Sequence, residues 1–216
     1  MVNIKQEDIY DICFNISKKI ILPKYQNLQD EDIKYKNGSD LVTLADIDAE
    51  RALKKNLLKI IPKANFVGEE EYAVNQNILN AYNEDIYCWT VDPIDGTANF
   101  VKGKDRFAIM IALTHKEKIL YSWIYKPLKD EMCLAINNEG AFINNKKIYT
   151  KNIKILNEAI GSISTKYWDD NYFDKLKLLK NNFAEVNSYG CIGFEYIDID
   201  LGKRNFAILS KLSTHG

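Results

Sequence analysis

Apolar residues recur at helical spacing in two stretches of the first third of the chain. In residues 1–22, isoleucines recur at helical spacing, with Ile9, Ile12, Ile16 and Ile20 three or four positions apart, and Pro23 follows directly. A second apolar stripe begins after Thr43 and continues to Pro62. Each pattern predicts a helix with one apolar face, because residues three or four apart share one side of a helix. Thr43 is suited as N-cap of the second helix, since a threonine oxygen accepts a free N–H of the first turn.

The rest of the chain alternates between strand-like and helical patterns. Runs rich in β-branched and aromatic residues, bounded by polar or Pro/Gly breaks, predict strands at Asn65–Val67, Ile86–Val91, Phe107–Leu113, Ile119–Tyr125, Glu131–Ile136, Ala159–Ile163, Phe183–Val186 and Phe206–Leu209. Two more helices are predicted at Asp169–Leu179 and Ile192–Leu201. No repeat and no long linker interrupts the chain, so residues 1–216 are predicted to form one domain. The expected fold class is α/β, or α+β, with helices layered against sheet.

The composition excludes several classes of protein. Of 216 residues, 46% are hydrophobic and 27% are charged, which is typical of a globular chain. Lys and Arg number 29 against 30 Asp and Glu, so the net charge of -1 gives no bulk attraction to nucleic acid or to an anionic membrane. The apolar runs are far shorter than the roughly 20 residues that span a bilayer. The first residues lack the basic start and apolar run of an export signal.

Cysteine and histidine usage points to a cytoplasmic protein whose chemistry rests on carboxylates. The four cysteines, Cys13, Cys88, Cys133 and Cys191, are widely spaced and form no C-x-x-C pair. This usage fits a reducing compartment, with the thiols as apolar filler. The chain has 2 histidines, which leaves few candidates for a zinc site or a Ser-His-Asp triad.

The most informative segment is Trp89–Phe100. An apolar strand leads into Asp92 and Asp95, and Gly96 and Thr97 follow where a helix can begin. Two carboxylates held close on a rigid turn repel each other and need a cation, and hard oxygen ligands select Mg²⁺ rather than zinc. If a helix begins here, its first N–H groups face a bound anion. The segment therefore predicts a metal and a phosphate at one corner.

Two other places offer carboxylates for the same corner. Gly68 lets the backbone turn sharply and aims Glu69 into the corner, while the next two glutamates point elsewhere. Asp46 lies in the first turn of the predicted second helix. Taken alone, an acidic run is typical of a solvated turn and Asp46 of a favourable helix-end charge. Turn chemistry does not account for the two aspartates and the threonine of Asp92–Thr97 in the same way.

In their order and spacing, these segments resemble the signature segments of the inositol monophosphatase family. The segments that carry the resemblance are Asp40–Thr43 with Asp46, Gly68–Glu70, Trp89–Phe100, Lys126–Glu131 and Gly140–Asn144. The resemblance covers almost the whole chain. It implies stacked helix and sheet layers and a Mg²⁺-dependent, lithium-sensitive hydrolysis of a small phosphomonoester, such as inositol monophosphate or a related sugar or polyol phosphate.

The resemblance also implies roles for single residues. The metal ligands carried over are Glu69, Asp92, the carbonyl of Ile94, and Asp95. Gly96 and Thr97 would hold the phosphate, with Lys36 as a basic residue nearby. Thr97 and Asp46 would orient the attacking water, and Glu70 would reach that water or a metal through solvent. Such a site activates water on one metal and stabilises the leaving oxygen on another, without a covalent intermediate.

The chain departs from the family pattern at its end. Family members continue into a Pro-Trp-Asp segment whose aspartate binds further metal, whereas this sequence reads Ser210–Gly216. We therefore expect a C-terminally truncated domain with an incomplete sheet and an activity reduced by the missing aspartate. Thr214-His215-Gly216 is what a one-base shift in the codons for Pro-Trp-Asp would encode; a natural or artificial end is the alternative.

Other functions remain open from the sequence. An inactive remnant would bind metal or act as an interaction domain, and an exposed sheet edge would favour a homodimer. A phosphatase of the haloacid dehalogenase type needs Asp-x-Asp near the N-terminus, whereas here two residues separate Asp92 from Asp95, and the pair lies in mid-chain. Histidinol phosphate, a nucleotide 3'-phosphate and fructose bisphosphate are alternative substrates.

Overall fold

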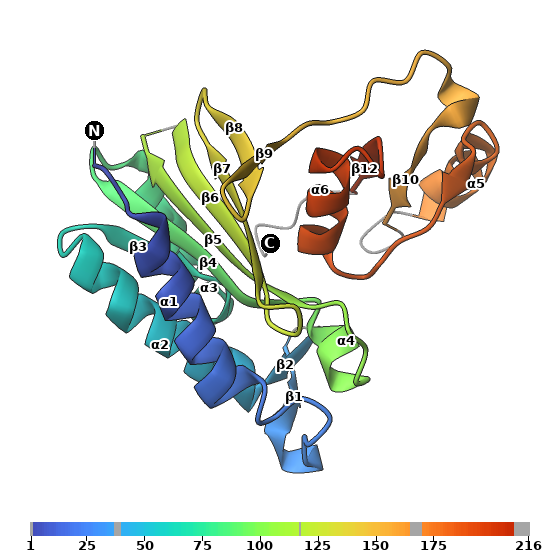
Figure 1. Ribbon diagram of the computed structural model, residues 1–216. Helices are drawn as coiled ribbons and strands as arrows, with labels where there is room; N and C mark the ends of the chain where they lie inside the picture. Colours follow the sequence, from blue (N-terminus) through green and yellow to red (C-terminus); the bar gives the residue numbers. More distant parts are fainter. Residues whose placement is uncertain (1, 37–39, 117, 165–169, 210–216) are drawn as a thin grey trace.

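The computed structural model describes residues 2–36, 40–116, 118–164 and 170–209. Helices α1 and α2 cover one face of a large sheet, and α6 lies toward its other face (Figure 1). A smaller sheet follows in the last quarter of the chain. The predicted layered arrangement of helix and sheet is confirmed. The segment Ser210–Gly216, on which the truncation argument rests, lies outside the described residues.

Both N-terminal helices form as predicted. Helix α1 spans Gln6–Ile16 and continues through a wider, π-helical turn at Ser17–Ile21, just before Pro23. Helix α2 spans Leu44–Ile60, and its N-cap Thr43 accepts the N–H of the third helical residue. The α2 helix therefore starts at the residue that its capping chemistry indicates.

The large sheet has the strand order β3-β4-β5-β6-β7-β8-β9. Its strands are β3 Asn65–Gly68, β4 Tyr87–Asp95, β5 Ala108–His115, β6 Lys118–Lys126, β7 Glu131–Ile136, β8 Gly140–Ile143 and β9 Lys146–Ile148. The first pair is parallel and the others are antiparallel. The five strands predicted from the middle section are confirmed. The pattern missed β8 and β9, a short hairpin in which Asn144 and Asn145 supply the positive φ of a tight turn.

The smaller sheet is parallel, in the order β11-β10-β12. Its elements are β10 Ile160–Ile163, α5 Asp170–Lys180, β11 Glu185–Val186, α6 Ile192–Asp200 and β12 Phe206–Ile208. These agree with the predicted runs to within two residues at each described end. The predicted start of the fifth helix, Asp169, lies outside the described residues.

Several short elements were not predicted. They are the hairpin of β1 Ile33–Tyr35 and β2 Leu41–Thr43, helix α3 Glu69–Val74, and 3₁₀ turns at Asp30–Asp32, Gln76–Asn83 and Leu156–Glu158. Elements of three to eight residues are too short to show a hydrophobic period. The β1–β2 hairpin and α3 flank the N-terminus of α2, so they shape the region of the predicted site.

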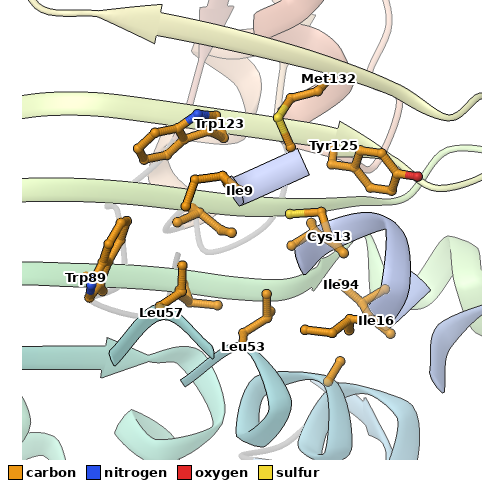
Figure 2. Close-up of a cluster of buried hydrophobic side chains, with 14 of the residues drawn as sticks. Ile9, Cys13, Ile16, Leu53, Leu57, Trp89, Ile94, Trp123, Tyr125 and Met132 are labelled. Carbon is orange, nitrogen blue, oxygen red and sulfur yellow. The ribbon is translucent and has the colours of Figure 1, made fainter. Parts of the chain in front are cut away.

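The main core fills the space between the two N-terminal helices and the sheet. Figure 2 shows Leu53 and Leu57 of α2 facing strand β4, with Leu57 next to Trp89, and Ile9 and Cys13 of α1 on the same side of the sheet. All five side chains are fully buried. This packing fixes the N-terminus of α2 relative to the end of β4. Each cysteine of the chain is buried and free of disulfide bonds. Within the described ranges, no helix is long and apolar enough to cross a membrane.

Candidate active site

The predicted aspartate motif lies where β4 ends. The pairing of β4 with β5 shifts between Asp92 and Asp95, so the strand bulges there. Gly96 follows with φ 86°, a left-handed conformation that favours glycine, and a Cβ there would come within 3.0 Å of the Arg106 carbonyl oxygen. Helix α4, Thr97–Val101, then begins. The bulge and the glycine turn together present both aspartates at one corner.

Asp46 and Thr97 meet at this corner from different elements. The Thr97 hydroxyl lies 3.2 Å from Oδ1 of Asp46 and 3.0 Å from the Ile94 carbonyl oxygen. Oδ2 of Asp46 accepts the N–H of Thr43 at 2.8 Å and also the Thr43 hydroxyl. Asp46 is fully buried. Burial raises the pKa of Asp46 to about 6, although the bonds from Thr43 oppose the shift.

Glu69 and Glu70 share a lysine. The Lys36 ammonium lies 2.9 Å from Oε1 of Glu69 and 2.6 Å from Oε1 of Glu70. Burial acts to lower the pKa of Lys36, but the two carboxylates outweigh it and raise that pKa. Burial, followed by the charge of Glu69, raises the pKa of Glu70 to about 8. Lys36 therefore occupies the place of a cation between these carboxylates.

Asp92 and Asp95 are held differently. Burial raises the pKa of Asp92 well above its usual range, and the charges of Glu69 and Asp95 raise it further. Asp95 is turned toward the start of α6, where it accepts the N–H of Gly193 at 2.6 Å and the Cys191 thiol at 2.9 Å. Burial raises the pKa of Asp95 as well, although these bonds act in the opposite direction.

The structure thus brings the predicted site residues from four segments into one neighbourhood. The group comprises Lys36, Asp46, Glu69, Glu70, Asp92, Ile94, Asp95, Gly96 and Thr97. Two expectations about the acidic run were wrong. The Glu70 side chain does not point away from Glu69, because both carboxylates contact the Lys36 ammonium. Gly68 has φ −104°, which any residue adopts, so its freedom to turn is not what the site uses.

The donor chemistry of this corner fits a hard divalent cation. In the part of the chain that the structure describes, no three acidic, thiol or imidazole side chains converge in the arrangement of a metal site. Part of the negative charge is neutralised instead by the Lys36 ammonium, which contacts Glu69, and by the N–H groups of α6 that donate to Asp95. All the donors are oxygens. Burial raises the pKa of Asp92, and repulsion from the charges of Glu69 and Asp95 raises it further. A dication would relieve this repulsion.

Two parts of the site, Glu50 and the start of α6, were not predicted from the sequence. Glu50 is a buried carboxylate whose oxygens accept backbone N–H groups of Glu70 and Glu71. The sequence feature that could have indicated Glu50 is its position on the apolar stripe of α2, where a charged residue stands three positions before Leu53. The start of α6, which binds Asp95, gave no signal because it lies almost a hundred positions away in the chain.

With this geometry in view, comparison with known proteins identifies the family. The model of the inositol monophosphatase family matches residues 6–215. The chain belongs to the inositol monophosphatase family. A curated member, the inositol monophosphatase of Dictyostelium discoideum, is 31% identical over 188 residues, covering 86% of this chain and 67% of that protein. Nus factor SuhB of Pasteurella multocida is 30% identical over 169 residues, covering 78% of this chain and 59% of that protein.

Solved structures of the inositol monophosphatase family share the fold. A crystal structure of an IMPase/NADP phosphatase, complexed with Mg²⁺ and phosphate, superposes with a TM-score of 0.77 at 23% identity, covering 94% of this chain and 74% of that chain. The chain spans about 60% to two thirds of the length of the first curated relatives it matches.

Proposed function

We propose that this chain hydrolyses a small phosphomonoester, inositol monophosphate or a related sugar or polyol phosphate, with Mg²⁺. The observation that carries the proposal is the meeting of a buried hydroxyl–carboxylate pair, Thr97 and Asp46, with the crowded carboxylates at the end of β4. Membership of the inositol monophosphatase family supports the reaction class. A relative of the same fold solved with Mg²⁺ and phosphate supports the metal and the substrate group.

The proposed metal ligands are Glu69, Asp92, the Ile94 carbonyl and Asp95. Bound Mg²⁺ lowers the pKa of a coordinated water and neutralises charge on the phosphoryl group. The carboxylates contribute by holding the cation in a position set by the β4 bulge. Asp95 has accepting capacity beyond its bonds to α6, because a carboxylate offers about four lone-pair sites. Glu70 would reach the water or a metal through solvent.

Thr97 and Asp46 are proposed to orient the attacking water. The Thr97 hydroxyl has a single proton, which it donates toward Asp46 or the Ile94 carbonyl. Its lone pairs are then free to accept a hydrogen bond from water. Because the pKa of Asp46 is about 6, its carboxylate is ionised at neutral pH and available to hold that water's proton. The pair therefore sets the direction from which the water approaches the phosphorus.

The phosphate is proposed to bind at the start of α4. Gly96 and Thr97 supply backbone N–H groups there, since the first N–H groups of a helix have no partner within it. Lys36 can turn to the phosphate once a cation takes over the charge of Glu69 and Glu70. The four buried free cysteines support a cytoplasmic location. Residues 1–216 are proposed to form one domain.

A panel of phosphomonoesters tests the activity. Release of inorganic phosphate is measured from inositol 1-phosphate, fructose 1,6-bisphosphate, histidinol phosphate and a nucleotide 3'-phosphate, each with Mg²⁺ and with a chelator. We expect release that needs Mg²⁺, is highest for a polyol phosphate and is inhibited by lithium. A covalent phospho-aspartate trapped with a fluoride complex would instead indicate a haloacid dehalogenase type of mechanism.

The second candidate is a metal-binding or interaction domain without turnover. The position of Lys36 favours it, because a lysine between the acidic ligands satisfies them without a metal. A relative named Nus factor SuhB shows that family members carry names other than phosphatase. Titration with Mg²⁺ and size-exclusion chromatography decide between the two: binding or dimerisation without phosphate release from any substrate would favour this candidate.

A further inference from the structure

Glu50 joins helix α2 to the start of helix α3. The residue is 6% exposed, and its side chain accepts the N–H of Glu70 through Oε2 at 2.7 Å and the N–H of Glu71 through Oε1 at 2.9 Å. The residue before α3, Gly68, has no side chain to cap the helix. The first N–H groups of a helix need acceptors from outside it, and here both come from one carboxylate of another helix.

The contact explains why residue 68 is glycine. A Cβ on Gly68 would lie 2.3 Å from the Glu50 carboxyl carbon and within 2.6 Å of both carboxylate oxygens. The backbone of Gly68 does not itself require glycine, because its φ is −104°. Glycine is needed here for space, so that a carboxylate can reach the turn from β3 into α3.

Glu50 occupies a costly position. Burial raises its pKa, the charges of Glu69 and Glu71 raise it further, and the two N–H bonds oppose these effects. Among the described residues, its partners are N–H groups rather than a lysine or arginine. A buried charge without a counter-ion does not improve stability in general. Its presence on the stripe that includes Leu53 and Leu57 therefore points to a positional role.

We propose that Glu50 is a positioning residue that fixes the start of α3 and so holds the Glu69 and Glu70 carboxylates at the proposed metal site, where both contact Lys36. This inference rests on the proposed Mg²⁺ site. Helix α3 has 6 residues, which is too short to hold its own geometry in water. Helix α2 is anchored by its buried leucines and also carries Asp46. One rigid helix thus places Asp46 directly and Glu69 through Glu50.

Mg²⁺ binding to the full chain tests the proposal. Titration calorimetry with MgCl₂ alone is run on the wild type, Glu50→Ala, Glu50→Gln and two controls. Partners that orient metal ligands typically change metal affinity by about 10–100-fold, so we expect that loss for Glu50→Ala. Glu50→Gln keeps the shape and one acceptor oxygen, and its affinity should lie between those of the wild type and Glu50→Ala. Amide hydrogen exchange at Glu70 and Glu71 should be faster in both variants.

The controls separate positioning from loss of charge or of stability. Glu71→Gln removes a nearby negative charge but keeps the cap on α3, since the Glu71 side chain pairs with Lys54. Leu57→Ala destabilises the same helix by opening a cavity two turns beyond Glu50. Both should bind Mg²⁺ within about twofold of the wild type, in contrast to the loss typical of an orienting partner.

The outcomes distinguish the two proposals. Wild-type affinity in Glu50→Gln, together with unchanged exchange at Glu70 and Glu71, would overturn the role of Glu50, and this variant decides the question if Glu50→Ala does not fold. A Mg²⁺ affinity lowered as much in Leu57→Ala as in Glu50→Ala would also overturn it. If the wild type binds no Mg²⁺, the proposed function fails, while faster exchange in Glu50→Gln would still support the hold of Glu50 on α3.

Discussion

The Thr97 hydroxyl lies 3.2 Å from Oδ1 of Asp46, although the two residues are 51 positions apart in the chain. Asp46 sits in the first turn of α2, and Thr97 begins α4 directly after the glycine turn. The core between α2 and β4 holds the two helix starts against each other. This contact between a hydroxyl and a buried carboxylate is the part of the proposed site that orients the attacking water and accepts its proton.

Removing the hydroxyl should slow the reaction without weakening substrate binding. Thr97→Ala is expected to lower kcat by about 10²-fold with little change in KM, the scale for losing a positioned proton-transfer partner. Asp46→Asn should have a similar effect, and the double variant should be little slower than either single one. Steady-state kinetics with the best substrate of the panel measures this.

The matched control is Thr114→Val, which removes a hydroxyl that donates to the Cys88 carbonyl on β4, away from the site. Its kinetics should equal those of the wild type. Losses that simply add in the double variant would show that Thr97 and Asp46 do not act together.

Replacing Asp92 should abolish Mg²⁺-dependent hydrolysis and stabilise the metal-free protein. Asp92→Asn replaces a carboxyl whose pKa is raised by burial and then by the charges of Glu69 and Asp95, so the cost of burying an ionisable group beside these charges falls. The expected signs are no Mg²⁺-dependent phosphate release and a thermal midpoint a few degrees higher without Mg²⁺. Asp48→Asn, on the exposed side of α2, should change neither. Full turnover by Asp92→Asn would exclude this residue from the site.

The metal-free protein should lose stability as the pH rises from about 5 to about 8. The pKa of Asp46 is raised to about 6, mainly by burial, and that of Glu70 to about 8, by burial and by the charge of Glu69. A carboxyl with a higher pKa in the folded state binds more protons there than when unfolded. Stability therefore falls between the unfolded pKa, about 4, and the folded value.

Urea midpoints measured in a chelator at several pH values check this dependence. Asp46→Asn should flatten the curve between about pH 4 and pH 6, the interval between the unfolded and folded pKa values of Asp46. Saturating Mg²⁺ should also flatten it, because the cation stabilises the ionised carboxylates. A midpoint that rises over this range would contradict the assignment of these raised pKa values.

Removing the lysine between the acidic ligands should strengthen metal binding and weaken substrate binding. Lys36→Met takes away the ammonium that contacts Glu69 and Glu70, which leaves more negative charge for a cation. We expect Mg²⁺ to bind several-fold more tightly and KM for the phosphomonoester to rise. Lys54→Met, which breaks the outer pair with Glu71, is the matched control. Weaker Mg²⁺ binding in Lys36→Met would show that Lys36 supports the metal site rather than competing with it.

The local pattern was enough to find the elements and the acidic motif. The apolar stripe after Thr43 predicted α2 and its cap, since both depend on neighbours within one or two turns. The motif Asp92–Thr97 stood out because an apolar strand, two aspartates and a glycine follow one another directly. The family resemblance then assigned roles to residues that the structure brings together.

Tertiary structure alone decided the contacts that join distant segments. Asp95 binds the start of α6, 98 positions away at Gly193, and Lys36 reaches Glu69 and Glu70 from the β1–β2 hairpin. Glu50 caps α3 across 20 positions, and that contact, rather than backbone freedom, requires Gly68. The reason is physical: hydrophobic period and capping are short-range properties of a sequence, whereas the partner of a buried charge is chosen by the packing that brings separate elements together.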